Sequence, residues 1–384
     1  MRDDVVIAAP VRTPIGRFGG ALASLSAVDL GVAAAKAALE RAGIAGERVG
    51  QAIFGHARQA GCGPNPARQV AVRAGIPVEK PAFTINQACL SGMQAILAAV
   101  RAIRTEEAKV VLAGGFESMS RVPYVLDARF GYRMGHKEAV DLMARDGFLD
   151  PLSGKIMGET AETLARQYGI TREEQDAYAA LSQQRCEAAR KAGAFDAEIV
   201  PVKDVLADEH PRDGVTASSL AGLKPVFEKD GTVTAGNSSG ITDGAAAMIV
   251  LTAEAAERLH VEPLARIAGW RVDGVAPEIM GIGPVPAVRN LLEAKGLAQG
   301  AIDLVELNEA FAAQVLAVDR DLGFDRDTLN VNGGAIALGH PIGCSGARIV
   351  VTLLHEMAKR KARRGLATLC VSGGMGGALL LERP

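Results

Sequence analysis

The chain repeats one pattern of helices and strands at an offset of just over 250 residues. A helix pattern that ends at Gly43, and the strand that follows it, recur 253 residues later. The Ser91-Gly92 pair recurs at an offset of 254 residues, and the run VVLAGG recurs as LCVSGG at an offset of 259. A near-constant offset over three elements indicates two duplicated halves rather than chance.

Within each half, strand-like runs alternate with Ala-rich amphipathic helices, which is the signature of an α/β fold. We expect strands at 5–9 (VVIAA), 49–55 (VGQAIFG), 82–86 (AFTIN) and 109–115 (KVVLAGG), and helices at 30–43 and from about residue 91. The first of these helices ends at a glycine, the favoured residue just beyond a helix C-terminus.

Residues 120–237 differ from both halves because they are richer in charge and are broken by turns such as HPRDG and EKDG. They contain one clear helix pattern, in which Thr171 and Glu174 form a capping box and Gly193 is a stop. We therefore expect an N-terminal half at 1–119, completed by about 238–262, a loop domain inserted at 120–237, and a C-terminal half at 263–384.

Composition argues against several classes of partner. The 384 residues are 48% hydrophobic and carry 42 basic and 44 acidic side chains, so a net charge of −2 gives no electrostatic reason to expect nucleic acid or an anionic membrane. No apolar segment approaches the roughly 20 residues of a membrane span. Five scattered cysteines without CxxC or zinc spacing favour a reducing, cytoplasmic setting and no metal site.

Cys89 is the first candidate for chemistry. In TINQACLSGMQAILAAV an apolar strand stops and an Ala-rich helix begins almost at the cysteine. A thiol at a helix N-terminus faces unpaired N–H groups and the positive end of the helix dipole, which favours the thiolate. An isolated cysteine is more often buried and inert, but here the equivalent turn of the second half carries a histidine.

That histidine, His340, lies in the run Asn330–Arg348, which holds five glycines. Such glycine density predicts sharp bends or close backbone approach, and His340 is the one side chain of the run that titrates near neutral pH. By the repeat, Gly343 rather than Cys344 falls opposite Cys89, so we interpret Cys344 as a packing residue.

Two more strand ends complete the set. Cys370 ends the strand ATLCV and is followed by SGGMGG, whose N–H groups could hold an oxyanion. Asn308, in VELNEAF, ends a strand where a helix starts, so a plain N-cap is the alternative. A thiolate, a histidine and a second thiol predict acyl transfer through a thioester.

Other catalytic motifs are missing. A serine hydrolase is less favoured than acyl transfer through a cysteine, and the sequence has neither a P-loop nor a well-placed GxGxxG. The remaining histidines lack a comparable setting and are expected at the surface or in the core: His56, His136, His210, His260 and His355.

With these residues assembled, the chain resembles the thiolase family from end to end. NQACLSGMQAI, GGFESMS, NEAFAAQ, NVNGGAIALGHPIGCSGAR and CVSGGMGGA look like thiolase motifs in their usual order. The resemblance implies a thiolase fold with duplicated five-layered αβαβα halves and an inserted loop domain. It also implies an assembly that is usually a homotetramer built from tight dimers.

The resemblance assigns roles as well. Cys89 would accept the acyl group, His340 would activate that thiol, and Cys370 would move the proton at the α-carbon. His340 and a water held by Asn308 would stabilise the enolate of acetyl-CoA. The backbone N–H groups of Cys89 and Ser372 would form the second oxyanion hole, although the family commonly has Gly at the latter position.

Coenzyme A contacts carry over from similar thiolases. The nucleotide and pantetheine would meet the following residues, the last three as pocket walls: Arg212, Ser219, Phe227, Ala235, Ser239, Met280, Phe148, Met157 and Phe311. Arg212 could pair with a phosphate, or it could be a solvated loop charge. No tightly bound cofactor is implied, since coenzyme A thioesters are the substrates.

The implied reaction is 2 acetyl-CoA to acetoacetyl-CoA plus CoA, in either direction. Short-chain thiolases often have His before the Met-Gly of KIMGETAE, whereas this chain has Ile156, which resembles thiolases of fatty-acid breakdown. Longer 3-ketoacyl-CoA substrates are therefore expected as well. The alternatives are a degradative thiolase preferring medium or long chains, a decarboxylating ketosynthase, and a non-catalytic thiolase-like scaffold or lipid carrier.

Overall fold

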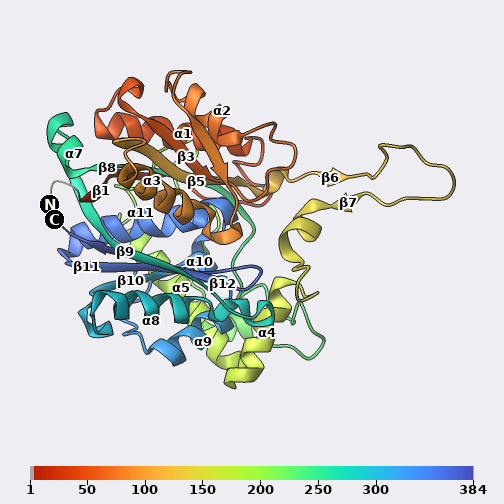
Figure 1. Cartoon of the computed structure of the whole chain (residues 1–384). Coiled ribbons are helices and arrows are strands. Elements are labelled where there is room, and N and C mark those ends of the chain that lie inside the picture. The colour runs from red at the N-terminus through yellow and green to blue at the C-terminus, as the bar shows by residue number, and fades with distance from the viewer. Residues whose placement is uncertain (1–3, 384) are drawn as a thin grey trace.

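The computed structural model describes residues 4–383, and the repeat is visible in its order of elements (Figure 1). The strands are β1 (Val5–Arg12), β2 (Gly16–Arg17), β3 (Gln51–Gly55), β4 (Ala82–Ile85), β5 (Val110–Ser118), β6 (Tyr124–Val125), β7 (Val140–Asp141), β8 (Thr242–Thr252), β9 (Pro263–Gly274), β10 (Leu304–Leu307), β11 (Arg364–Val371) and β12 (Met375–Glu382). The helices are α1 (Ala27–Ala42), α2 (Pro66–Arg73), α3 (Ser91–Arg104), α4 (Met157–Tyr168), α5 (Arg172–Lys191), α6 (Ala217–Ala221), α7 (Ala253–Leu259), α8 (Pro284–Lys295), α9 (Ala312–Leu322), α10 (Ala335–Leu338) and α11 (Ile342–Arg360).

The strands follow the same rule in both halves. The first half has the order β4-β3-β5-β8-β1 and the second β10-β11-β12-β9. In the first half β3 runs parallel to β4 and β5, and β8 runs antiparallel to β5 and β1. In the second half β10 runs parallel to β11, and β12 runs antiparallel to β11 and β9. The two sheets join where β1 pairs with β9, Ile7 opposite Ala265.

The molecule has five layers: outer helices, a sheet, central helices, a second sheet and outer helices. Three large hydrophobic cores fill the spaces between them, and the middle core fills two of these spaces. One core lies between the outer helices α1 and α2 and the first sheet. The second surrounds α3 and α11, which pack against each other and lie between the two sheets. The third lies between the second sheet and the outer helices α8 and α9, and α4 and α5 of the insertion join it. The duplicated, five-layered α/β architecture that the sequence predicted is therefore confirmed (Figure 1).

The central helices cross at two equivalent glycines of the repeat. A Cβ at Gly92 of α3 would lie 2.7 Å from the backbone nitrogen of Ala347, and one at Gly346 of α11 would lie 2.6 Å from that of Met93. Neither distance is tolerable, so both positions need the absence of a side chain. The close crossing brings the N-terminal ends of α3 and α11 together. Cys89 lies just before α3 and His340 just before α11, so both residues come to the same place.

Most predicted elements are confirmed, and the insertion differs most. Helix α5 has the capping box at Thr171 and Glu174, and the chain turns left-handed at Gly193. The insertion also forms α4 and α6, which the charge-rich sequence did not predict. Helix α4 follows Ile156, which has no side-chain oxygen for a cap, and Glu159 accepts the Ile156 N–H instead at 2.9 Å.

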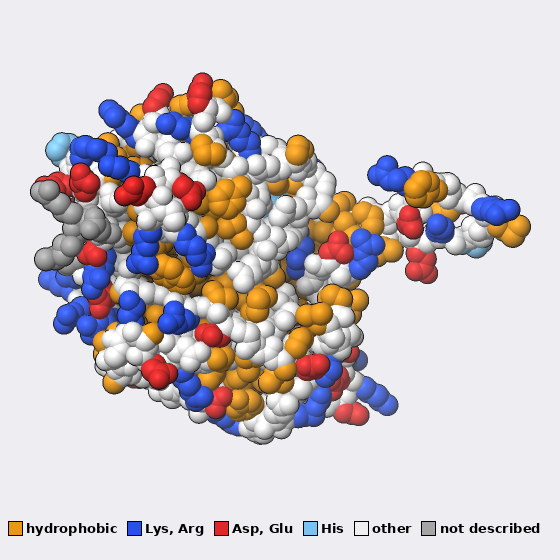
Figure 2. Space-filling view, viewed as in Figure 1, with side chains coloured by type: hydrophobic (Ala, Val, Ile, Leu, Met, Phe, Trp, Pro, Cys, Tyr) orange, Lys and Arg blue, Asp and Glu red, His pale blue; other side chains and the backbone are white. Residues whose placement is uncertain are grey.

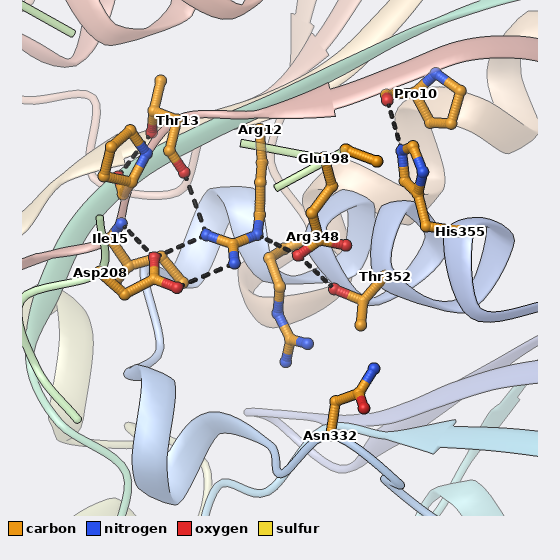
Figure 3. A network of polar contacts seen from close by, with 12 residues as sticks. Pro10, Arg12, Thr13, Ile15, Glu198, Asp208, Asn332, Arg348, Thr352 and His355 are labelled. Atoms are coloured by element: carbon orange, nitrogen blue, oxygen red, sulfur yellow. Dashed lines mark hydrogen bonds and ion pairs between the residues drawn. The ribbon is translucent and has the colours of Figure 1, made fainter. Parts of the chain in front are cut away.

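A buried ionic network fixes the insertion to the first half (Figure 3). Arg12 of β1 is fully buried and contacts Glu198 at 2.5 Å and Asp208 at 2.6 and 2.9 Å. Thr352 of α11 donates to Glu198 at 3.3 Å, and Arg348 of the same helix lies beside the network. Because a buried charge is tolerated only when it is paired, these contacts specify one position for residues 198–208.

No helix within residues 4–383 has the length and apolar character that crossing a membrane requires.

Candidate active site

Cys89 and His340 meet although they are 251 residues apart. Cys89 lies in the short turn Ala88–Leu90 that leads into α3, and His340 lies two residues before α11. The His340 Nε2 atom is 3.4 Å from the Cys89 Sγ atom. The other ring nitrogen, Nδ1, is 2.5 Å from the Ser345 Oγ atom. The crossing of α3 and α11 therefore assembles a thiol and imidazole pair from the two halves of the repeat.

The thiol of Cys89 is protonated at rest. Burial raises its pKa above the usual value, although the charge of Arg58 and the backbone N–H groups of Ser372 and Cys89 itself lower it. The thiolate expected from the helix N-terminus is therefore a wrong prediction for the resting chain, because the cost of burying an anion exceeds what the N–H groups return. A base must remove the proton.

His340 is neutral and available as that base. Burial and the nearby positive charges of Arg348 and Arg58 lower its pKa to about 3. Its backbone N–H donates to the Gly240 carbonyl at 2.9 Å, which holds the residue against the strand-β8 side of the site. An uncharged imidazole with a free nitrogen beside a thiol is the arrangement that general-base activation of a nucleophile requires.

Cys370 supplies a second buried thiol at the end of β11. It is 1% exposed, and burial raises its pKa well above the usual value; a negative charge on Cys89 would raise it further. The chain then turns through Gly373 and Gly374, both with positive φ. The Ser372 N–H group at the start of this turn reaches the Cys89 sulfur, so two predicted oxyanion donors, of Cys89 and Ser372, lie at one atom.

Asn308 follows β10 and has an unusual environment. It is fully buried, and neither its Oδ1 nor its Nδ2 atom has a hydrogen-bond partner. The alternative of a plain N-cap is wrong, because α9 begins four residues later with Phe311 at the cap position. A buried amide without a partner costs free energy, which makes it a candidate for holding a polar group that enters the site.

A carboxylate fixes the chain on the C-terminal side of His340. Glu117, at the end of β5, accepts from the backbone N–H groups of Ala57, Arg58 and Gly343 at 3.1, 3.2 and 2.9 Å. It also forms an ion pair with His56 at 3.0 Å. Burial would raise the pKa of Glu117, but His56, Arg58 and the N–H groups hold it below its usual value.

A second carboxylate fixes the chain on the N-terminal side. Glu309 is fully buried and accepts from Tyr178 Oη at 2.8 Å, Ser182 Oγ at 2.6 Å and Asn330 Nδ2 at 3.0 Å. It also accepts from the backbone N–H of Ile336 at 3.1 Å, four residues before His340. Neither glutamate was predicted from the sequence as a functional residue, although GGFESMS and NEAFAAQ carry acids at or just after strand ends, a signal that could have found them.

The predicted pocket walls fall into two groups. Met280, Phe311, Met157 and Phe227 belong to the hydrophobic core that also contains Cys370. The rings of Phe227 and Phe311 meet edge to face at 6.1 Å. Phe148 and Cys89 pack instead against a small cluster formed by Ala57, Met119, Met143 and Ile342. Apolar walls of this kind therefore lie beside both thiols.

The predicted polar contacts for coenzyme A lie nearer the surface. Arg212, Ser219 and Ala235 are exposed, and Ser219 closes a capping box with Thr216 at the start of α6. The Ser239 N–H donates to the Ala310 carbonyl at 3.0 Å, two residues after Asn308. In the part of the chain that the structure describes, neither Arg212 nor Ser219 forms a hydrogen bond to Cys89 or Cys370. Within residues 4–383 no group of three His, Cys, Asp or Glu side chains is arranged to hold a metal ion.

Cys344 and His56 are both buried outside the thiol and imidazole pair. Cys344 is buried in the central core, and burial raises its pKa to about 12, as a packing residue requires. His56 was expected at the surface or in the core, and it is fully buried in the core. Burial would lower its pKa, but Glu117 and Cys62 outweigh burial and raise it to about 9.

Comparisons with known proteins agree with this geometry. Residues 5–254 match the thiolase N-terminal domain, and residues 261–383 match the thiolase C-terminal domain. The chain is 52% identical to the acetyl-CoA acetyltransferase of Cupriavidus necator, covering 99% of each, and 51% identical to that of Escherichia coli, covering all of each.

Solved structures give the same result. The acetyl-CoA acetyltransferase of Bacillus anthracis superposes with a TM-score of 0.96 at 47% identity, covering 99% of each chain. Human mitochondrial 3-ketoacyl-CoA thiolase in complex with CoA has a TM-score of 0.96 at 45% identity, covering 99% of this chain and 98% of that one. With both domains matched and the paired thiol and imidazole in one site, the chain belongs to the thiolase family.

Proposed function

We propose that this protein is an acetyl-CoA acetyltransferase that joins two acetyl-CoA molecules to acetoacetyl-CoA and CoA and runs the reaction in both directions. The observation that carries the proposal is the 3.4 Å contact between His340 Nε2 and Cys89 Sγ beside a second buried thiol. Relatives named acetyl-CoA acetyltransferase, about half identical over their full length, support the substrate.

In the first half-reaction His340 Nε2 takes the Cys89 proton and the thiolate attacks the thioester carbonyl of acetyl-CoA. The tetrahedral oxyanion accepts from the N–H groups of Cys89 and Ser372. Its collapse forms the Cys89 thioester and expels the CoA thiolate, which takes the proton of Cys370, so that Cys370 becomes a thiolate and His340 keeps the proton it took from Cys89. The preorganised N–H groups stabilise the charge as it develops, without reorganisation of solvent.

In the second half-reaction Cys370 takes a proton from the methyl carbon of a second acetyl-CoA. The enolate oxygen accepts from His340 and from a water held by Asn308, whose two side-chain polar atoms have no other partner. The carbon then attacks the acyl group on Cys89, and the tetrahedral intermediate expels the Cys89 thiolate, which takes back the proton of His340. An acylated Cys89 cannot ionise, so the repulsion that a Cys89 thiolate would exert on a Cys370 thiolate is absent at the step in which Cys370 acts as the base.

The coenzyme A contacts belong to this proposal. Pantetheine would lie along Met157, Phe227, Met280 and Phe311, with Phe148 and Ser239 nearby, and the nucleotide near Arg212, Ser219 and Ala235. The shared apolar core of the first four residues supports this course. The CoA complex of the human mitochondrial thiolase, a relative of the same fold, supports a CoA thioester as substrate, and we propose no tightly bound cofactor.

Chain length is a finer part of the proposal. The partly buried, apolar Ile156 precedes α4, whose first residue is the wall residue Met157. We expect activity on acetoacetyl-CoA with some tolerance of longer 3-ketoacyl-CoA. A degradative preference for longer chains is the second candidate, favoured by the likeness to a 3-ketoacyl-CoA thiolase. Initial rates against chain length separate the two, and no activity beyond four carbons would contradict the tolerance.

Assembly and compartment are proposals too. An arm between β6 and β7 extends from the body and carries exposed apolar side chains (Figure 2), with Phe130 97% and Met134 94% exposed. Such exposure is typical of a surface covered by another subunit, which supports a homotetramer. Replacing both residues with serine should lower the mass measured by light scattering. All five cysteines are free, which supports a cytoplasmic enzyme.

We also propose the division into an N-terminal half at 1–119 completed by about 238–262, an insertion at 120–237 and a C-terminal half at 263–384. The position of β8 between β5 and β1 supports the return of the chain to the first half after the insertion. Limited proteolysis within 120–237 should then leave the two halves associated.

The decisive test of function uses acyl-enzyme formation. Wild-type protein incubated with acetyl-CoA should gain one acetyl group, detected by intact mass, and Cys89→Ala should gain none. Cys344→Ala is the matched control, because this thiol is buried and lies in the core rather than at the site. Full thiolysis by Cys89→Ala would contradict the proposal. Activity with malonyl thioesters alone would favour a ketosynthase. A Cys89 thiol that does not react with iodoacetamide at neutral pH would favour a non-catalytic scaffold.

A further inference from the structure

Ser345 stands directly behind the imidazole of His340, on the side away from Cys89. Its Oγ atom is 2.5 Å from Nδ1 of His340 and 3.0 Å from the carbonyl oxygen of Pro341. The carbonyl can only accept a hydrogen bond. In its bond to Pro341 the Ser345 hydroxyl is therefore the donor, a common bond from a serine to the residue four positions before it in a helix. The Oγ atom then presents a lone pair to the ring.

We propose that Ser345 is a positioning residue that holds His340 in the tautomer with its proton on Nδ1, so that the Nε2 lone pair faces the Cys89 thiol. This inference rests on the proposed function, since it concerns the same site. A neutral imidazole carries one N–H, and the second nitrogen is the acceptor. With Nδ1–H donated to Ser345, Nε2 is left to take the thiol proton at 3.4 Å.

The same bond also survives the proton transfer. When His340 becomes an imidazolium, both ring nitrogens are donors. An Oγ atom that accepts from Nδ1–H keeps its bond in that state, whereas a hydroxyl that donated to Nδ1 would lose it. The geometry therefore suits both ends of the reaction without movement of the serine, which is the meaning of a preorganised supporting group.

The serine is itself held in place. It is 1% exposed and lies in the first turn of α11, where the Gly343 N–H donates to Glu117 at 2.9 Å. The charged and titratable groups that influence the ring are Cys89, Arg58, Arg348 and Glu117. None of them contacts Nδ1, so Ser345 is the group that decides which nitrogen carries the proton.

The test compares Ser345→Thr with Ser345→Val, because threonine and valine have nearly the same shape and differ in the hydroxyl. The full-length protein is treated with iodoacetamide over a range of pH without any substrate, and modification of Cys89 is followed by mass spectrometry. Thr352→Val serves as a control that removes a buried hydroxyl from the same helix, away from the ring.

We expect Ser345→Thr to keep the wild-type pH profile and Ser345→Val to alkylate about tenfold more slowly at neutral pH, the effect of losing one hydrogen bond to a group that becomes charged. The rise of the Cys89 alkylation rate with pH should move to higher pH in Ser345→Val. Its kcat should fall, with KM for acetyl-CoA nearly unchanged. Equal profiles for the two variants, or a change in KM alone, would overturn the inference.

Failure of this inference is distinguishable from failure of the proposed function. If Cys89 forms no acyl-enzyme in the wild type, the function fails, while the alkylation profiles still report the tautomer. If acylation occurs but Ser345→Val behaves as Ser345→Thr, only the role of Ser345 fails. Thermal unfolding of both variants checks that each is folded. A folded Ser345→Thr variant that has lost the wild-type pH profile would also contradict the role of Ser345.

Discussion

Glu117 and Glu309 are both fully buried, and they hold the His340 segment from its two sides. Glu309 receives four donors from uncharged groups, including the Ile336 N–H. Glu117 receives three backbone donors, including the Gly343 N–H, and also has the cationic partner His56. The comparison shows two ways to bury a negative charge: with neutral donors alone, or with donors and a counter-charge.

The difference has a consequence for the site. A carboxylate held by fixed neutral donors is insensitive to pH over the range in which its donors do not titrate. A carboxylate paired with a histidine depends on the proton of that histidine. The N-terminal side of the His340 segment should therefore be fixed at any physiological pH, and the C-terminal side should loosen when His56 loses its proton.

The largest effect is expected for Glu117→Gln. The amide nitrogen would meet either two backbone N–H groups or one of them and His56, and the buried histidine would lose its counter-charge. Breaking a buried ion pair costs about 3–5 kcal/mol of unfolding free energy. Because Gly343 is released, kcat should fall more than tenfold. Chemical denaturation and steady-state rates measure both, and a variant as stable as wild type would contradict the role of the pair.

Glu309→Gln is the matched substitution at the other carboxylate and should cost less, about 1–3 kcal/mol. The hydroxyls of Tyr178 and Ser182 can rotate to accept, but the Asn330 amide and the Ile336 N–H cannot. Each of these two fixed donors faces a different oxygen of Glu309, so either orientation of the glutamine amide leaves one clash. A loss larger than that of Glu117→Gln would reverse the comparison.

The pH dependence of stability should separate the two sides again. The pKa of His56 is raised to about 9, so its stabilisation is fully present below its unfolded value near 6.5 and is lost as the pH rises through 9. Unfolding free energy should fall by up to about 1.4 kcal/mol per pH unit in that window. Wild type and Glu309→Gln should share this slope in denaturation series, and Glu117→Gln should lack it.

The sequence predicted the duplicated fold and the pairing of Cys89 with His340 because strand ends and glycine-rich turns leave local patterns, and Cys370 and Asn308 are proposed from the same kind of pattern. It did not predict the resting protonation of Cys89, because burial depends on side chains from both halves that the repeat brings together only in space. His56 and Glu117 were missed as a pair for the same reason, since 61 residues separate two polar side chains whose contact only the parallel pairing of β3 and β5 creates.

The smallest effect concerns Arg58, which lies on the Glu117 side of the site. Its side chain is buried and its Nε atom has no partner, and its positive charge lowers the pKa of the Cys89 thiol. Arg58→Leu should therefore shift the alkylation limb of Cys89 to higher pH and slow alkylation at neutral pH by a few fold. Arg58→Lys keeps the charge and is the matched control, expected near wild type. Since the charge also lowers the pKa of His340, the leucine variant should make that imidazole easier to protonate. If the pH dependence of Cys89 alkylation does not shift in the leucine variant, burial and the backbone N–H groups alone determine the pKa of the thiol. The two sides of the site would then differ only in how their carboxylates are held.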